Sequence, residues 1–512
     1  MLVKTYGSAV YGINATIITI EVSASQGFRF LLVGLPDNAV KESQQRIEAA
    51  LRNNGHKIPG KKLIINMAPA DIKKEGSSYD LPLAIGILAA GEEIVPDNLE
   101  DYIIMGELSL DGSLMPVKGV LPIAIEAKKR GFKGFILPKH NAREAAVVKD
   151  LEVLGIESIR EVIGFLNGEI ALEPTIVDTR NEFFANINDY NVDFADVKGQ
   201  ENVKRALEIA AAGSHNIIMI GPPGAGKTML AKRLATILPP LSLHEALETT
   251  KIHSVAGKIS KETSLLTIRP FRSPHHTISD VALVGGGSFP QPGEISLAHN
   301  GVLFLDELPE FKRSVLEVMR QPLEDRNISI SRSKFSVEYP ASFMLVASMN
   351  PCPCGFYNHP EKDCVCSTGV VQKYLNKISG PLMDRIDIHI EVVPVPFDKL
   401  AEQRRSETSE DIRYRVMQAR KIQSARYQGQ NGIHSNSQMT PALLKDYCEL
   451  DSESNTLLKN AMEKLGLSAR AYDRILKVSR TIADLDASAN IRPQHLAEAI
   501  QYRSLDRDSW AG

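Results

Sequence analysis

The chain has 512 residues, 43% of them hydrophobic and 24% charged, with a formal net charge of -3. This length predicts about three domains, and the composition is typical of a globular soluble protein. No apolar run approaches the roughly 20 residues that span a bilayer, and the start, MLVKTYGSAVYGINATIITIEV, lacks the basic leader of a secretion signal. We expect a cytoplasmic protein with no membrane span, whose only nucleic-acid surfaces would be local clusters of Lys and Arg.

Residues 1–170 predict an α/β domain, because short apolar runs such as ATIITIEV alternate with helical patterns such as DNAVKESQQRIEAALRNNG. Within it, GELSLDGSLMPV predicts a hairpin closed at Asp111-Gly112, a pair that tolerates positive φ. Residues 171–196 are poorly periodic and carry six acidic residues against the single base Arg180, which indicates an acidic linker.

Residues 197–396 predict a second α/β domain, and residues 397–512 predict a helical one. In the last part, SARAYDRILKVSRTIADL and RPQHLAEAIQYR place apolar residues three and four apart, as amphipathic helices require.

The segment GPPGAGKT fits the phosphate-loop pattern G-x-x-x-x-G-K-[ST], with strand-like NIIMI before it and helical MLAKRLATIL after it. Backbone N–H groups of such a loop, together with the helix N-terminus, bind phosphate. Lys227 is then expected to reach the β- and γ-phosphates of ATP, and Thr228 to bind Mg²⁺. The expected nucleotide-binding residues are Gly221, Pro222, Pro223, Gly224, Ala225, Gly226, Lys227 and Thr228.

Two further apolar runs end in polar residues. GVLFL leads to Asp306 and Glu307, and such a run suits a parallel strand whose carboxyl end opens into a ligand crevice. Asp306 is the candidate second Mg²⁺ ligand, and Glu307 is the candidate that positions or deprotonates the attacking water. FMLVA leads to Asn350, a candidate γ-phosphate sensor, although an ordinary Asn-Pro turn has the same sequence.

Phosphate loop, Asp-Glu pair and strand-end Asn, in this order, resemble AAA+ ATPases. The stretch FRSPHHTISDVALVGGGSFPQPGEISLAHNGVLFLDELPEF closely resembles the magnesium-chelatase-like subgroup, and nearly the whole chain resembles the YifB/ComM family. The resemblance implies a Lon-protease-like (ribosomal S5 domain 2-like) N-terminal domain, an AAA+ core with a parallel sheet and a helical C-terminal lid.

The resemblance also implies roles for two arginines. SGPLMDRIDI resembles the arginine-finger segment of the subgroup, which assigns Arg385 to the ATP of a neighbouring subunit. Arg470 stands where such ATPases carry a nucleotide-sensing arginine, with Arg474 as the alternative. An arginine beside Asp384 or Asp387 can equally form a surface ion pair. A finger supplied in trans requires a closed ring, and the family implies a homo-hexamer.

The family is associated with branch migration and helicase action in natural transformation. The resemblance therefore implies single-stranded or branched DNA as the substrate, with recombination or DNA-uptake proteins as possible partners. A protein-remodelling ATPase of the chelatase type and, less favoured, an ATP-dependent protease are the alternatives.

Local basic clusters are the candidate DNA contacts. Hairpins that project into a ring channel would bind phosphates without reading sequence, although a solvated charged face gives the same pattern. The candidates are Lys251, Lys258, Lys261, Arg269 and Arg272, followed by His275 and His276, and Arg326, Arg332 and Lys334 in RNISISRSKFSVEYP, which predicts a hairpin.

The cysteines Cys352, Cys354, Cys364 and Cys366 form two C-x-C pairs separated by nine residues. Four thiolates at this spacing can hold Zn²⁺, but four reduced thiols are equally natural in a reducing compartment. Cys448 is expected to be a small core residue.

The Lon-like resemblance places Ser78, in KKEGSSYDLP, at the position of a protease nucleophile, and MPVKGVL places Leu121 where the lysine base belongs. A serine without a base is a poor nucleophile, so peptidase activity is not expected unless Lys118 compensates. The alternative for Ser78 is a helix cap. A scaffold or DNA-facing platform is the expected role of this domain.

Overall fold

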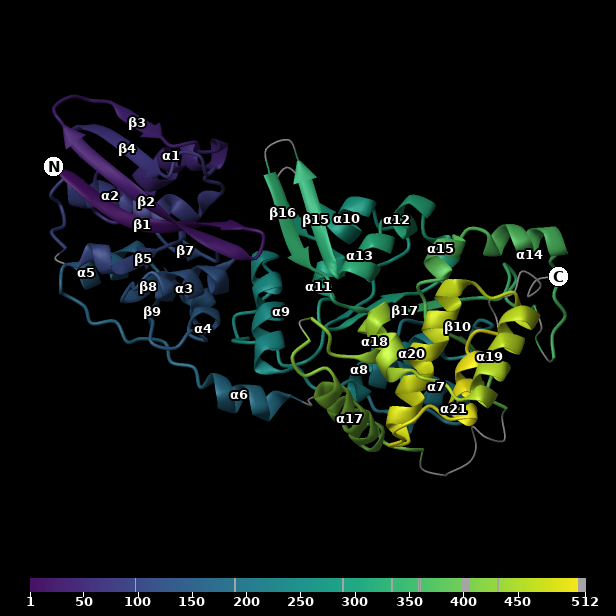
Figure 1. The fold of residues 1–512 in the computed structure, drawn as a ribbon. Helices are drawn as coiled ribbons and strands as arrows, with labels where there is room; N and C mark the ends of the chain where they lie inside the picture. The colour runs from purple at the N-terminus through teal and green to yellow at the C-terminus, as the bar shows by residue number, and fades with distance from the viewer. Residues whose placement is uncertain are drawn as a thin grey trace.

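The chain forms two lobes, one built from the N-terminal third and the other from the ATPase and C-terminal parts (Figure 1). The computed structural model describes residues 1–96, 98–187, 190–287, 290–332, 335–357, 359, 361–396, 406–430 and 432–504. Across these residues no helix is both long and apolar enough to cross a membrane.

The N-terminal lobe is built on a seven-stranded mixed sheet in the order β3-β4-β2-β1-β5-β8-β9. Helix α2 runs through the core with all of its residues buried, as its apolar sequence DLPLAIGILAA predicts. The expected hairpin at Gly112 is present and that glycine has a φ of +87°. The predicted α/β domain is confirmed. Its strands are β1 (Leu2–Tyr11), β2 (Asn14–Ser25), β3 (Phe30–Val33), β4 (Lys62–Ala68), β5 (Tyr102–Ile104), β6 (Glu107–Leu108), β7 (Leu114–Met115), β8 (Gly134–Pro138) and β9 (Glu152–Ile156), and its helices are α1 (Asn38–Asn53), α2 (Asp80–Ala90), α3 (Val120–Lys129), α4 (Ala142–Ala145) and α5 (Ile159–Leu166).

The acidic linker contains a helix that its sequence did not predict, α6 (Thr179–Asn186). Asp178 caps this helix by accepting a hydrogen bond from the backbone N–H of Asn181. Glu182 pairs with Arg143 at 2.7 Å and accepts the hydroxyl of Ser264 at 2.7 Å. The linker is thus fastened to both lobes.

A five-stranded parallel sheet in the order β11-β14-β17-β10-β18 forms the centre of the second lobe. Strands β10, β14 and β17 are buried along their whole length, in keeping with their apolar sequences. The predicted hairpin β15-β16 is present. The strands are β10 (Ile217–Ile220), β11 (Phe271–Arg272), β12 (Gly285–Gly286), β13 (Gln291–Pro292), β14 (Val302–Leu305), β15 (Asn327–Arg332), β16 (Phe335–Pro340), β17 (Met344–Met349) and β18 (Ile388–Glu391), and the helices are α7 (Glu201–Gly213), α8 (Lys227–Ile237), α9 (Leu243–Val255), α10 (Asp280–Val284), α11 (Glu294–Leu297), α12 (Arg313–Glu317), α13 (Arg320–Asp325), α14 (Thr368–Leu375) and α15 (Gly380–Met383).

The C-terminal part is helical, as predicted, and packs beside α7 and α8 (Figure 1). A buried ion pair at 2.5 Å between Arg426 and Asp484 ties two of its helices together. Its helices are α17 (Ser409–Arg426), α18 (Pro441–Tyr447), α19 (Ser452–Leu465), α20 (Ala469–Leu485) and α21 (Pro493–Gln501), with the short turn η6 (Asn436–Gln438).

The two lobes meet through a small apolar cluster centred on Leu121, at the start of α3. Its backbone N–H lies 3.4 Å from the hydroxyl oxygen of Ser254 on α9, and the N–H of Gly119 donates to the Ser254 carbonyl at 3.0 Å. Because burial removes these apolar side chains from water, the cluster stabilises the contact between the lobes. The buried members of the cluster are Leu121, Val147, Phe183, Leu241, Ala246 and Leu265.

We expect Leu121→Ala to lower the free energy of unfolding by about 2–5 kcal/mol, since it leaves a cavity in a fully buried cluster. Chemical denaturation checks this, with Leu110→Ala, at a 58% exposed leucine, as the matched control. Equal stability of the two variants would contradict a packed contact between the lobes.

Candidate ATP-binding site and its surroundings

The phosphate loop follows β10 and leads into α8, as its sequence predicts. Gly224 and Gly226 have φ values of +80° and +88°, a conformation that side chains with a Cβ rarely adopt. A Cβ at Gly221 would lie 2.1 Å from the carbonyl oxygen of Val392, so this position also requires glycine. The loop therefore turns tightly and presents the N-terminus of α8 at the carboxyl edge of the sheet.

Lys227 is buried in this loop. Its ammonium group donates hydrogen bonds to the carbonyls of Gly221 (2.7 Å) and Pro222 (2.9 Å), and to the amide oxygen of Asn350 (3.2 Å). Burial lowers the pKa of Lys227, while Asp306 and Glu307 act in the opposite direction. The structure thus brings the predicted lysine and the predicted strand-end asparagine into contact.

Asp306 connects three separate segments at this edge. One carboxylate oxygen accepts the hydroxyl of Thr228 at 2.7 Å. The other accepts the hydroxyl of Ser348, at the end of β17, and the backbone N–H of Glu307 at 3.1 Å. A hydroxyl and a carboxylate side by side are the oxygen ligands that Mg²⁺ prefers, so Thr228 and Asp306 fit the predicted metal role. Sequence reasoning missed the contribution of Ser348, although it stands two residues before Asn350.

Glu307 adopts a left-handed backbone conformation with a φ of +54°. Such a conformation is unfavourable for a non-glycine residue and is common at functional sites. Its side chain is 58% exposed and lies 3.4 Å from the ring of His276. From the sequence alone His276 follows the basic cluster, and its place in the distinctive PFRSPHH stretch is the signal that points to a different role. The exposed carboxylate therefore lies beside the phosphate loop, next to His276, where a water molecule can reach it.

Gln200 is a further residue at this site that sequence reasoning missed. Its side-chain amide donates to the carbonyls of Ala225 (2.9 Å) and Val393 (3.1 Å), so it braces the phosphate loop against the segment after β18.

The arginine candidates lie at the opposite edge of the same sheet. The carbonyl of Arg385 accepts a hydrogen bond from Asn216, which immediately precedes β10, whereas the phosphate loop follows β10. The guanidinium of Arg385 is 7% exposed, donates to Pro381 at 2.6 Å and pairs with Glu324 at 2.5 Å. A strand of four residues spans about 13 Å, so Arg385 cannot contact phosphates in its own loop.

The two candidate sensors of the C-terminal domain differ in exposure. Arg470 is 59% exposed and lies 3.7 Å from Asp384, whereas Arg474 is half-buried and pairs with Asp387 at 2.8 Å. Both acidic partners are near Arg385 and far from the phosphate loop of the same chain.

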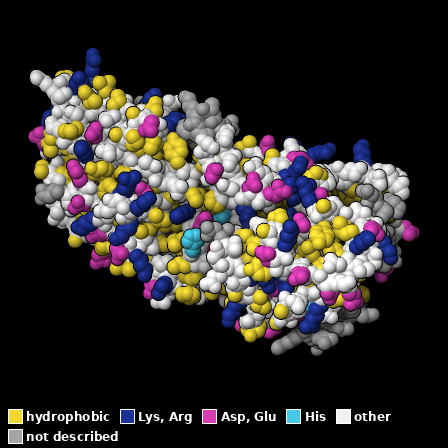
Figure 2. Space-filling model, in the orientation of Figure 1, with side chains coloured by type: hydrophobic (Ala, Val, Ile, Leu, Met, Phe, Trp, Pro, Cys, Tyr) yellow, Lys and Arg dark blue, Asp and Glu magenta, His cyan; other side chains and the backbone are white. Residues whose placement is uncertain are grey.

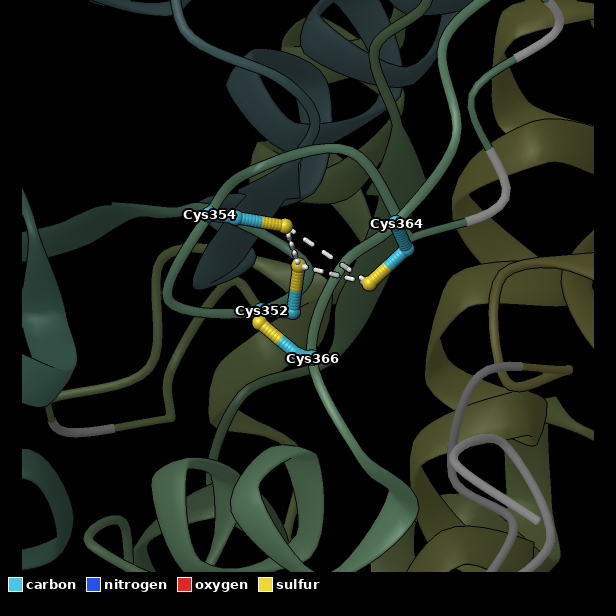
Figure 3. Close-up of side chains that lie close together, drawn as sticks. All are labelled: Cys352, Cys354, Cys364 and Cys366. Atoms are coloured by element: carbon cyan, nitrogen blue, oxygen red, sulfur yellow. Dashed lines mark hydrogen bonds between the residues drawn. The ribbon is translucent and has the colours of Figure 1, made fainter.

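The four clustered cysteines converge, with their sulfur atoms turned toward one another (Figure 3). Cys352 Sγ lies 3.3 Å from that of Cys354, and all four sulfurs lie within 4.8 Å of one another. Burial acts to raise the pKa of Cys354, but hydrogen bonds from the Phe356 backbone and the Cys352 thiol outweigh it and bring the value to about 6. Four soft donors at this separation fit a tetrahedral zinc site. Cys448 is buried in the core, as expected.

The cysteine loop packs against the phosphate loop. Gly355, with a φ of +84°, approaches so closely that a Cβ there would lie 2.5 Å from Cδ of Pro223. The cysteine loop also begins directly after Asn350, at the end of β17. It therefore adjoins both the phosphate loop and the strand end that carries Asn350.

Ser78 and Lys118 both line a cavity of about 450 Å³ between the N-terminal lobe and hairpin β15-β16. Among the described residues no hydrogen bond joins them. Ser78 does not cap a helix, because the short turn Ser77–Tyr79 and helix α2 both lack a side-chain cap, so the alternative interpretation of Ser78 is wrong. Leu121 is fully buried between the lobes and leaves no room for a lysine base.

Two of the predicted DNA-contacting arginines are paired within the protein, and a third, Arg326, faces a cavity. Arg269 donates to the carbonyls of Pro239 and Asn300, and Arg272 pairs with Glu294 at 2.6 Å. Arg326 is the residue that ends α13, immediately before the hairpin, and it lines a cavity, so the expectation that the hairpin itself carries it is wrong. Lys334 lies outside the described residues. On the face in Figure 2, basic and acidic side chains are interspersed over both lobes.

Comparisons with known proteins agree with this geometry. The family described as magnesium chelatase, subunit ChlI, matches residues 193–400, and models of further ChlI parts match residues 20–141 and 406–503. Competence protein ComM of Haemophilus influenzae is 45% identical over 511 residues, covering 99% of this chain and 98% of that protein. The uncharacterized protein YifB of Escherichia coli is 45% identical, covering 98% and 96%.

Lon protease 2 of Bacillus subtilis shares 32% identity over 155 residues, which is 28% of this chain and 27% of that protease. The 45% identity to ComM and YifB extends over nearly the full length of the chain. Together with the phosphate loop and its Asp-Glu pair, this identity establishes the family. The chain belongs to the YifB/ComM family of magnesium-chelatase-like AAA+ ATPases, with a Lon-protease-like N-terminal domain and a helical C-terminal domain.

Proposed function

We propose that this chain is an ATP-hydrolysing motor that assembles as a hexameric ring and moves single-stranded or branched DNA. The observation that carries the motor is the contact set at one sheet edge: Lys227 to Asn350, and Thr228 to Asp306, with Glu307 beside them. The name of the similar competence protein from Haemophilus influenzae supports DNA as the substrate.

At this site the AAA+ family implies ATP with Mg²⁺, and the residues present fit both. Thr228 and Asp306 would hold the metal, which when bound neutralises charge on the phosphates. Lys227 and the N–H groups of the loop bind the triphosphate. Glu307 accepts a proton from, or orients, the attacking water, and Asn350 fixes the lysine and senses the γ-phosphate.

The position of Arg385 supports action between subunits. Arg385 lies at the edge where β10 begins, whereas the phosphate loop of the same chain lies at the edge where β10 ends. Any contact between Arg385 and ATP therefore has to be made to the ATP of a neighbouring chain. In the single chain Glu324 holds its guanidinium, and an incoming triphosphate can replace that carboxylate. Arg470, 59% exposed beside Asp384, is the proposed second contact.

The proposed DNA contacts are Lys258, Lys261 and Arg332. Lys258 and Lys261 are exposed after α9, and Arg332 ends the first strand of hairpin β15-β16. A competing proposal, a protein-remodelling ATPase of the chelatase type, is favoured by the chelatase family models that match all three domains. DNA dependence separates the two.

We also propose that Cys352, Cys354, Cys364 and Cys366 hold Zn²⁺ in a structural role. The close approach of the four sulfur atoms raises the pKa of Cys364, because neighbouring thiols disfavour its charged form. A bound divalent cation favours four thiolates and would fix the loop that touches Pro223.

The rate of ATP hydrolysis is expected to increase when single-stranded or branched DNA is added at low salt, and this increase is expected to become smaller as the salt concentration rises.

We expect Lys227→Ala to lose nucleotide affinity, because the ammonium group that binds the phosphates is absent. Glu307→Gln is expected to keep nucleotide and hydrolyse it about 10²–10⁴-fold more slowly. Steady-state ATPase and nucleotide-binding assays check these results, and a rate unaffected by either DNA would favour the chelatase-type remodeller.

A mixing experiment tests Arg385. Arg385→Ala alone is expected to lose about 10³–10⁵-fold in hydrolysis rate. Mixed with Lys227→Ala subunits, it is expected to regain part of the activity, because some seams then combine an intact loop with an intact finger. Energy transfer between donor-labelled and acceptor-labelled subunits would show that the two variants share rings. No recovery of activity in such mixed rings would mean that Arg385 serves only in its ion pair with Glu324.

Metal analysis of purified protein is expected to find one zinc per chain, lost in Cys364→Ser and retained in Cys448→Ser, whose thiol lies in the core. Chelation is expected to lower the melting temperature of the wild type and not of Cys364→Ser. Absence of zinc after expression in zinc-supplemented medium would show that the four thiols are simply reduced.

A further inference from the structure

A second cavity, of about 360 Å³, lies at the amino edge of the parallel sheet, opposite the phosphate loop. Its floor is formed by the residues at which the strands begin: Asn216 before β10, Gly301 before β14, Met344 in β17 and Asp387 before β18. Its other walls come from α17, η6 and α20 of the C-terminal domain. The cavity therefore lies between the core and the helical domain, and it is separate from the ATP site.

Four arginines line this cavity, Arg269, Arg326, Arg420 and Arg474, against two carboxylates. Both carboxylates are already engaged. Glu245 pairs with Arg269 at 3.3 Å. Asp387 pairs with Arg474 and also accepts the backbone N–H of Asn216 at 3.0 Å. The charge of the cavity is thus positive after its internal pairs are satisfied.

The remaining positive charge is on Arg326 and Arg420. The terminal nitrogens of Arg420 donate to the carbonyls of His434 (3.3 Å) and Ala211 (3.2 Å) and to the hydroxyl of Ser214. Within the described ranges, the guanidinium of Arg326 forms no hydrogen bond or ion pair. The Nε of Arg420 is buried and likewise lacks a partner among those residues. An unpartnered polar group facing a cavity is costly, and an unpartnered charge more so. The free guanidinium of Arg326 and the unpartnered Nε of Arg420 can therefore both gain from an anion in the cavity.

Burial of these groups, and to a smaller extent their mutual repulsion, supports that conclusion. Burial, with Arg474 nearby, lowers the pKa of Arg326 to about 10. Burial, with Arg269 nearby, lowers the pKa of Arg420 to about 9. Burial also lowers the pKa of Lys477, which is next to the cavity, to about 8. An anion would relieve both the desolvation and the repulsion.

We propose that this cavity binds a small phosphorylated molecule, with Arg326 and Arg420 as its phosphate ligands. Guanidinium groups match phosphate oxygens in planar, bidentate geometry, which favours phosphate over a spherical anion. The volume lies within the range of about 300–1,000 Å³ typical of small-molecule sites, and Leu238, Pro240 and Phe343 add an apolar wall. Because the occupant would touch both the core and the helical domain, it would fasten one to the other.

Two sources share this chemistry, a free phosphate or pyrophosphate and the phosphate end of a nucleotide. The test uses the full chain carrying Lys227→Ala, so that the phosphate loop does not contribute. Calorimetric titration with pyrophosphate, and separately with ADP, is expected to show one saturable site per chain. Adding Arg326→Gln is expected to weaken binding at least about tenfold, because a charged hydrogen bond is lost. Lys421→Gln, at the exposed lysine next to Arg420 on α17, is the matched control and is expected to bind normally.

The melting temperature measured without ligand shows whether each variant is folded. Arg326→Gln removes a repelled charge, so its melting temperature is expected to equal or exceed that of its parent. Tighter binding of ADP than of pyrophosphate would identify a nucleotide as the occupant, and the reverse order would identify free phosphate. The proposal is overturned if the Lys227→Ala parent binds neither probe, or if Arg326→Gln binds both as its parent does. Either result would leave the ATPase tests unaffected.

Discussion

The carboxylate of Asp306 is the constraint on which the nucleotide site depends. It accepts hydroxyls from Thr228 on α8 and Ser348 on β17, and it follows β14 itself. These contacts exist only because β17 lies between β14 and β10 in a parallel sheet. A slip of one residue in any of these strands would turn its polar end away, since neighbouring side chains in a strand point to opposite faces.

The same sheet has a second functional edge. Where the strands end, it carries the phosphate loop and Glu307, and where they begin, it carries Arg385, Asp387 and the arginine-lined cavity. Parallel strands keep the two edges apart at a fixed distance, so one chain cannot complete its own site with Arg385. In the proposed ring each subunit would offer one edge to each neighbour, which is the geometry that couples hydrolysis between subunits.

The N-terminal lobe shows how a catalytic position becomes structural. Leu121 stands where the Lon-like resemblance expects a lysine, and here it is the buried centre of the contact between the lobes. A charged amine at this point would be buried without a partner, which is unfavourable. The position therefore contributes to packing between the domains and carries no base. Ser78 and Lys118 nevertheless line the same cavity.

The sequence by itself determined the α/β and helical parts, the hairpins at Gly112 and β15-β16, and the residues of the phosphate loop, because these depend on local periodicity and turn chemistry. It did not predict α6, whose apolar Phe183 is explained by contacts distant in the chain, nor the role of Ser348 or the pairing of His276 with Glu307. It also placed Arg326 on a channel-facing hairpin, because a charge run does not reveal which face it occupies. Only the tertiary structure decided which charges share a cavity and which sheet edge each one reaches, since burial and pairing arise from segments that meet only in the folded chain.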